Sequence, residues 1–128
     1  NKPHIFGRQR ILNERDEPIG EEEDLLIVSS GVSVEEVAAL VSGLGGIAVP
    51  AHIDKQANSL LAVLGTFDPA LGFTLVECAQ DGVVDLPRIV DSDAHYIWDI
   101  SEAEHWIEAE TCSAHGVFAA LRRMAAGK

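Results

Sequence analysis

Short apolar segments alternate with amphipathic segments along this chain, and that alternation constrains its fold more than any other feature. The clearest helix begins at Ser33, because Ser33 and Glu36 form a capping box ahead of apolar residues at helical spacing. Gly45 and Gly46 end this helix, and the apolar segment 47–49 that follows is predicted to be a buried strand. A repeat of helix and strand at roughly 20-residue intervals is typical of an α/β protein with a parallel sheet.

The remaining segments extend the same pattern. A second helix is predicted over 58–64 and a longer one over 113–126, whereas 73–78 and 88–90 are predicted strands and 104–110 alternates as a strand does. We therefore expect a single α/β domain over 1–128, a partial parallel sheet with flanking helices. Residues 1–24 are expected to be an arm with a possible hairpin turning at Arg15 and Asp16, and 25–128 to hold the βα units.

The charge balance limits the possible partners. The chain has 21 acidic and 9 basic residues, a net charge of −12, which repels phosphate backbones and anionic membrane surfaces. We expect no membrane partner and no broad nucleic-acid surface, although a phosphorylated small molecule can bind where metal ions reverse the local charge. Cys78 and Cys112 lie far apart in sequence and lack metal-ligand spacing, which predicts reduced thiols and a cytoplasmic location.

Three candidate metal ligands follow predicted strands. His52 comes directly after segment 47–50, and Asp93 and His95 come after Ile89 and Val90. In a parallel sheet the carboxyl ends of the strands meet at one edge, and residues two apart in an extended segment point to the same side. Imidazole and carboxylate groups are ligands for Zn, Mn or Fe, so we expect these three side chains to converge on a divalent metal ion. The alternative interpretation is that Asp93 caps a turn and the histidines are packed or hydrogen-bonded.

Three other polar residues are candidates for supporting roles. Glu77 ends a predicted strand and is either a partner that fixes a histidine tautomer or an ordinary loop carboxylate. Asp54 competes with His52 for the same face, and Lys55 is either a contact for an anionic substrate or a solvated side chain. No serine or cysteine nucleophile motif is present, so the sequence indicates no catalytic residue beyond the metal ligands.

Two of these segments resemble a known family. Gly45–Asp54 (GGIAVPAHID) and Val90–Tyr96 (VDSDAHY) are similar to the third and fourth motifs of the PHP (polymerase and histidinol phosphatase) family, and segments 6–9 and 19–22 resemble the stretch before them. The resemblance implies a distorted (β/α)7 barrel that holds two or three metal ions at its C-terminal face. It also implies hydrolysis of phosphoesters, including histidinol phosphate and nucleotide-type substrates, with His52, Asp93 and His95 as metal ligands.

The chain lacks other motifs of that family. The opening His-x-His pair, the second histidine motif and the metal-bridging glutamate are missing, and His4 is the one histidine before His52. The sequence therefore resembles the C-terminal half of a PHP domain, and we expect a missing N-terminal half or a second copy to cover its open face. As an isolated fragment it is expected to be a weak or inactive phosphoesterase. Two alternatives remain: a non-catalytic oligomerising or binding fragment without a metal site, and a different amidohydrolase-like hydrolase.

Overall fold

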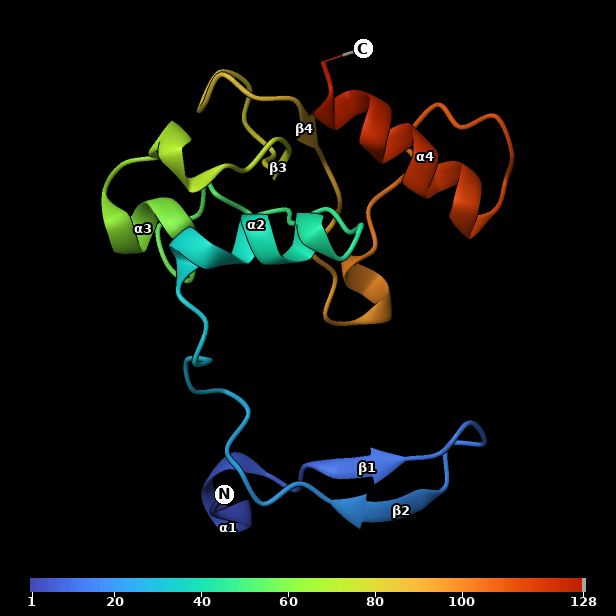
Figure 1. Ribbon diagram of the computed structural model, residues 1–128. Coiled ribbons are helices and arrows are strands. Elements are labelled where there is room, and N and C mark those ends of the chain that lie inside the picture. Colours follow the sequence, from blue (N-terminus) through green and yellow to red (C-terminus); the bar gives the residue numbers. More distant parts are fainter. Residues whose placement is uncertain (128) are drawn as a thin grey trace. The chain divides into compact units, whose positions relative to one another are not determined.

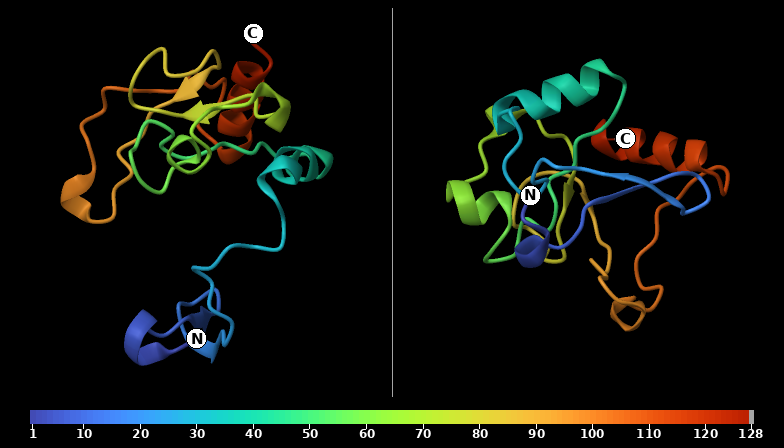
Figure 2. Two further views of the ribbon diagram at one scale, coloured as in Figure 1. Left: turned by 90° about the vertical axis from the view of Figure 1, so that its left-hand side faces the viewer. Right: turned by 90° about the horizontal axis from the view of Figure 1, so that it is seen from below.

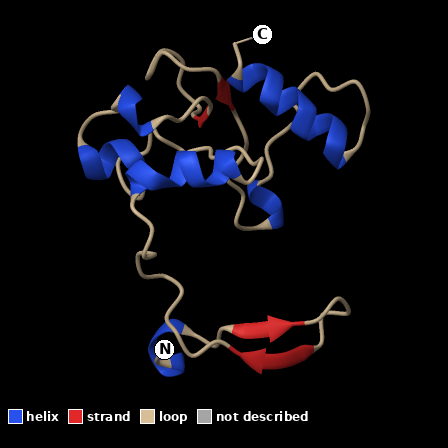
Figure 3. Cartoon of the chain, in the orientation of Figure 1, coloured by secondary structure: helices blue, strands red, loops and turns tan. Residues whose placement is uncertain are grey.

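The computed structural model describes residues 1–127 and divides into two compact units, Asn1–Gly31 and Val32–Lys128. Figure 1 labels the helices and strands, and Figure 3 shows that the strands are short and that long loops connect the elements. The mixture of helices with two small sheets is consistent with the general α/β class. No helix within 1–127 is long and apolar enough to cross a membrane.

The first unit is a hairpin preceded by one helical turn. Helix α1 (Pro3–Phe6) leads to β1 (Arg10–Leu12), which pairs antiparallel with β2 (Pro18–Glu21). The turn is built on Asn13, whose side-chain oxygen accepts from the backbone N–H groups of Arg15 and Glu17 at 2.9 and 3.0 Å. None of residues 1–31 is buried, so hydrogen bonds rather than an apolar core organise this unit.

Helix α2 (Val34–Gly43) begins the second unit where the capping box predicts it. The Glu36 carboxylate accepts from both the backbone N–H and the hydroxyl of Ser33, at 3.1 and 2.9 Å. At the other end Gly45 has φ +80°, and the N–H of Gly46 donates to the Val41 carbonyl at 2.8 Å. The helix therefore stops where the sequence predicts, because glycine adopts this left-handed conformation without steric cost.

The other elements follow in chain order. They are α3 (Leu60–Leu64), the 3-10 turn η1 (Pro69–Leu71), β3 (Val76–Glu77), β4 (Arg88–Ile89), the 3-10 turn η2 (Ile97–Asp99) and α4 (Ala114–Ala125). Strand β3 pairs in parallel with β4, and Figure 2 shows the two arrows side by side. On the other side of β3, the backbone N–H of Glu77 donates to the Pro50 carbonyl, and the backbone carbonyl of Glu77 accepts from the N–H of Ile53, both at 3.0 Å. Three parallel backbone segments therefore lie next to one another: 50–53, β3 and β4.

Two segments that were predicted to be strands do not form strands in the structure. Residues 47–49 form no ladder, because Pro50 has no N–H to donate and contact with β3 begins only at its carbonyl. Residues 104–110 also have no regular structure. There the Glu108 carbonyl accepts from the guanidinium of Arg123 in α4 at 3.4 Å rather than from a neighbouring strand.

Most of the buried apolar residues of the second unit form two small clusters. The first surrounds the buried residues Ala38, Leu71 and Phe73, and the second surrounds Ile53, Val76 and Cys78. The partly buried Leu60 and Phe67 contact both clusters, and the rings of Phe67 and Phe73 lie 6.2 Å apart. Other large apolar side chains stay in solvent: Leu40, Leu44, Val63, Ile97, Trp98, Ile100 and Trp106.

Candidate functional site

The candidate site lies at the carboxyl ends of the three parallel segments. Segment 50–53 carries His52, β3 ends at Glu77, and the chain after β4 carries Asp93 and His95. Because the segments run in parallel, their carboxyl ends fall on the same edge, which is where the sequence predicts the functional groups.

An ion pair joins two of these ends. The ammonium of Lys55 donates to Oδ2 of Asp93, across 38 positions of sequence. This hydrogen bond holds the pKa of the Asp93 carboxyl below its ordinary value, and the charges of Lys55, His52 and His95 act in the same direction.

His52 carries a polar atom that no neighbour satisfies. Its Nδ1 is buried and has no hydrogen-bond partner within the described residues. Its backbone has φ +32°, a conformation that is costly for a residue with a Cβ atom. A β-bulge accounts for this conformation. Pro50 and Ile53 both form backbone hydrogen bonds with Glu77, so the segment has one residue more between them than a regular parallel ladder and His52 lies in the bulge.

The Asp93 backbone is held from both sides. Its N–H donates to Oδ1 of Asp91 at 2.8 Å, and its carbonyl lies 2.8 Å from Nδ1 of His95. Its φ of +44° again lies in the left-handed region. These contacts fix the backbone of Asp93 and engage Nδ1 of His95, which leaves Nε2 as the ring atom that can bind a cation.

Sequence reasoning missed the role of Asp91. The spacing of Asp91 and Asp93 is the available signal, because an aspartate often accepts from the backbone N–H two residues later.

The two other carboxylates hold more ordinary positions. Oδ2 of Asp54 accepts from the backbone N–H of Gln80 at 3.0 Å, so Asp54 anchors the loop after β3. Glu77 is fixed through its backbone between segment 50–53 and β4, and its charge together with that of Asp54 acts on Lys55. Neither residue is in the direct ion pair with Asp93.

The candidate side chains are of types that bind divalent cations, but too few of them lie together within the described residues to hold one. An unpartnered imidazole nitrogen and a nearby carboxylate are suitable ligands for Zn, Mn or Fe. Within residues 1–127, however, no three His, Cys, Asp or Glu side chains are grouped so that they could hold a metal ion. The predicted convergence of His52, Asp93 and His95 on one cation is therefore not seen within these residues, and the Asp93 carboxylate is paired with Lys55 instead.

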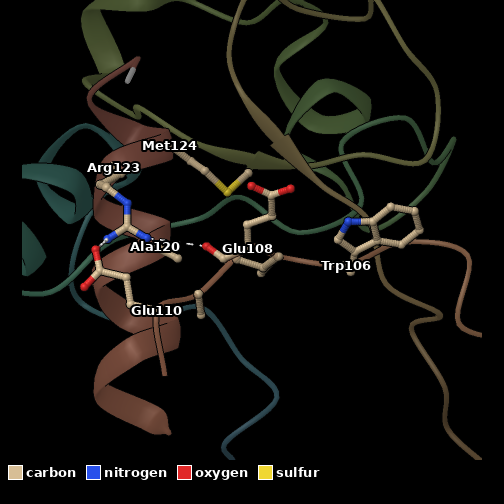
Figure 4. A pocket seen from close by; sticks show the side chains of 8 residues that line it. Trp106, Glu108, Glu110, Ala120, Arg123 and Met124 are labelled. Atoms are coloured by element: carbon tan, nitrogen blue, oxygen red, sulfur yellow. Dashed lines mark hydrogen bonds and ion pairs between the residues drawn. The ribbon is translucent and has the colours of Figure 1, made fainter. Parts of the chain in front are cut away.

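A separate pocket of about 520 Å³ lies between α4 and residues 106–110. Arg123 contacts Glu110 at 3.5 Å and the Glu108 carbonyl at 3.4 Å, and Trp106 and Met124 complete the wall (Figure 4). None of the candidate metal ligands lines this pocket. It is therefore distinct from the edge that carries His52 and Asp93.

Comparison of the chain with protein-family models, with curated proteins and with solved structures gives no match.

Proposed function

We propose that this chain contributes His52, Asp93 and His95 to a metal-dependent phosphoesterase centre of the PHP type. One observation carries the proposal: the buried Nδ1 of His52 has no hydrogen-bond partner within the described residues, and it lies at the edge of the parallel segments that Asp93 and His95 follow. The positive φ angles of His52 and Asp93 support it, because strained backbone at polar residues is more frequent at functional sites.

In this proposal the side chains of His52, Asp93 and His95 bind the cation, and hydrogen bonds of the Asp93 backbone stabilise the loop that carries two of them. A bound divalent cation supplies a lowered water pKa and neutralises phosphoryl oxygens. The Asp91 carboxylate fixes the backbone of Asp93 by accepting from its N–H, and the Asp93 carbonyl contacts the His95 ring. The substrate is a phosphorylated small molecule or a nucleotide-type phosphoester, since the net charge of −12 disfavours long polyanions.

The proposed centre needs ligands from outside these residues. Three donors hold one metal ion weakly, whereas a clamp of two or three ions on a phosphate needs further carboxylates and imidazoles. An N-terminal half of a PHP barrel, or a second copy, would supply them and would cover exposed apolar side chains such as Leu44, which is 90% exposed. The 128-residue chain alone is then a weak or inactive hydrolase.

Metal retention tests the proposal. The chain is brought to equilibrium by dialysis against buffer that contains Zn²⁺, Mn²⁺ or Fe²⁺, and the metal bound at each free concentration is measured, with the double variant His52→Ala/Asp93→Ala beside it. We expect metal in the parent chain, none in the double variant, and unchanged binding in His105→Ala, because His105 is exposed and lies outside the site. Equal metal content in all three proteins would contradict the proposal.

The second candidate function is a non-catalytic oligomerising or binding module. The exposed apolar residues of α2 and α3, among them Leu40 and Val63, favour it, because such side chains mark surfaces that are covered in an assembly. This candidate predicts a metal-free protein whose thermal stability is unaffected by His52→Ala/Asp93→Ala. It also predicts a dimer by sedimentation equilibrium that Leu40→Glu dissociates.

A further inference from the structure

Residues 96–106, which we call the aromatic loop, expose several large apolar side chains together. The loop holds both tryptophans and the one tyrosine of the chain, and Trp98, Trp106 and Tyr96 are 80, 78 and 62% exposed. Ile97 and Ile100 are exposed beside them. Figure 1 and Figure 2 both show the first part of this loop, in orange, projecting from the rest of the second unit. Large apolar side chains gathered on a surface in this way mark a place where a partner binds.

Two of these rings are stacked on each other. The ring centres of Tyr96 and Trp98 lie 5.0 Å apart with an interplanar angle of 5°, so each ring covers one face of the other and leaves its outer face in solvent. The 3-10 turn η2 orders them, because Oδ2 of Asp99 accepts from the Tyr96 N–H and the Asp99 N–H donates to the Tyr96 carbonyl, both at 3.0 Å. The stack is therefore formed before a partner arrives, which lowers the entropy cost of binding.

The charge of the aromatic loop indicates which kind of partner fits it. The loop contains three carboxylates, Asp99, Glu102 and Glu104, and no lysine or arginine. All three side chains are exposed, and within residues 1–127 none of them forms an ion pair with a basic side chain. Such a surface repels nucleic acids and anionic membranes. Since the face of an aromatic ring attracts cations as well, the rings and the carboxylates favour the same positively charged partner.

A guanidinium group fits this surface better than an ammonium group. It is planar, so it stacks on a ring face, and its N–H groups can bind both oxygens of a carboxylate, whereas an ammonium is a compact and strongly hydrated charge. The chain itself contains such a contact, because the guanidinium of Arg122 lies 4.8 Å from the centre of the Phe118 ring. Ile97 and Ile100 add exposed apolar surface on which the methylene groups of an arginine can pack.

We propose that the aromatic loop is a docking surface for an arginine-rich segment of a partner protein. One guanidinium stacks on the outer face of the Tyr96–Trp98 pair, and neighbouring arginines of the same segment pair with Glu102 and Glu104. The inference is independent of the proposed metal centre, because none of the three candidate metal ligands lies in the loop.

Peptide titration of the 128-residue chain tests the inference. Hexa-arginine and hexa-lysine are titrated by calorimetry, and intrinsic fluorescence is followed in parallel, because every tryptophan and tyrosine of the chain lies in the loop. We expect hexa-arginine to change the fluorescence and to bind about threefold or more tighter than hexa-lysine. Trp98→Leu should weaken hexa-arginine binding by about two- to fivefold, because one face for the guanidinium is lost.

Matched variants separate the aromatic loop from the rest of the surface and from the net charge. Leu44→Ala removes an exposed apolar side chain outside the loop and should leave hexa-arginine binding unchanged. Glu102→Gln/Glu104→Gln should weaken binding by about two- to fivefold. Glu35→Gln/Asp85→Asn removes the same number of exposed charges elsewhere in the second unit, and salt screening should keep its effect below about 1.5-fold.

Three results of these titrations would each overturn the inference: equal affinity for the two peptides, equal losses in the two charge variants, or unchanged binding in Trp98→Leu. Sedimentation equilibrium adds a fourth, because a dimer of the parent chain that Trp98→Leu dissociates would mean that the loop binds a second copy instead. Far-ultraviolet circular dichroism checks that every variant is folded, which we expect because each altered side chain is exposed.

Discussion

The two units of this protein are stabilised by different forces. Residues 1–31 contain no buried side chain, and polar side chains such as Asn13 and Gln9 hold the hairpin through backbone hydrogen bonds. Residues 32–127 instead pack two apolar clusters around Phe73 and Ile53. Since burial rather than hydrogen bonding supplies most of the net stability of a fold, the second unit is the one that can sustain itself.

Truncation of a core side chain should give the largest difference in stability between the two units. Phe73→Ala removes a ring that is 9% exposed and packs against Phe67, and we expect a loss of about 3–5 kcal/mol in the free energy of unfolding. Ile19→Ala in the hairpin removes a side chain that is 65% exposed and should cost less than about 0.5 kcal/mol. Urea unfolding followed by circular dichroism measures both, and equal costs would refute the division into a packed unit and an unpacked one.

Glycine substitutions test the packing more locally. A Cβ at Gly116 in α4 would lie 2.2 Å from the Thr111 carbonyl oxygen, so Gly116→Ala forces α4 and the preceding loop apart. We expect a loss of about 1–3 kcal/mol. Gly31→Ala, at the end of the first unit, meets no atom within 4 Å and should be neutral. Thermal melting of the two variants would contradict the account if Gly31→Ala proved the more damaging.

The hairpin turn can be weakened without touching the core. Asn13→Ala removes the acceptor for the N–H groups of Arg15 and Glu17, with an expected local cost of about 0.5–1.5 kcal/mol. Amide hydrogen exchange should speed up around β1 and β2, and protection of Val76 and Cys78 N–H should stay unchanged. Faster exchange at Val76 and Cys78 would show that the two units unfold together.

The capping box predicts a small pH effect within the second unit. The backbone and side-chain hydrogen bonds from Ser33 lower the pKa of Glu36. Its stabilising contribution to α2 is therefore complete above the ordinary pKa of a glutamate and is lost as the pH falls through the lower folded-state value. Helicity should fall over this range, and Glu36→Gln should remove that part of the pH dependence. Glu35→Gln is the control, and an identical pH profile for both variants would exclude the capping box as its cause.

Local sequence signals predicted local structure well. The Ser33 capping box, the glycine ends of α2 and α3 and the hydroxyl cap of Ser113 on α4 are each set by residues close in sequence. The parallel pairing of β3 with β4 also follows the predicted order of elements. The strand predicted over 47–49 did not form, because its ladder depends on a partner and Pro50 removes a donor.

The site was predictable in its placement but not in its contacts. Asp93 follows β4 as the apolar run before it predicts, whereas His52 lies within segment 50–53 because the run 47–49 forms no strand; the two share an edge because the segments are parallel. The bond from Lys55 to Asp93 spans 38 positions and depends on the path of the loop after β4. No periodicity in the sequence encodes such a contact. From the sequence alone, Lys55 is therefore either a substrate contact or a solvated side chain.

The five histidines allow the most direct test of the proposed metal site. Nitrogen-15 spectra of the imidazole rings are recorded while Zn²⁺ is added to the chain. The account predicts that His52 and His95 shift together and saturate at the same zinc concentration, while His4, His105 and His115 keep their positions. Uniform small shifts of all five rings, or unchanged signals from His52 and His95, would contradict it.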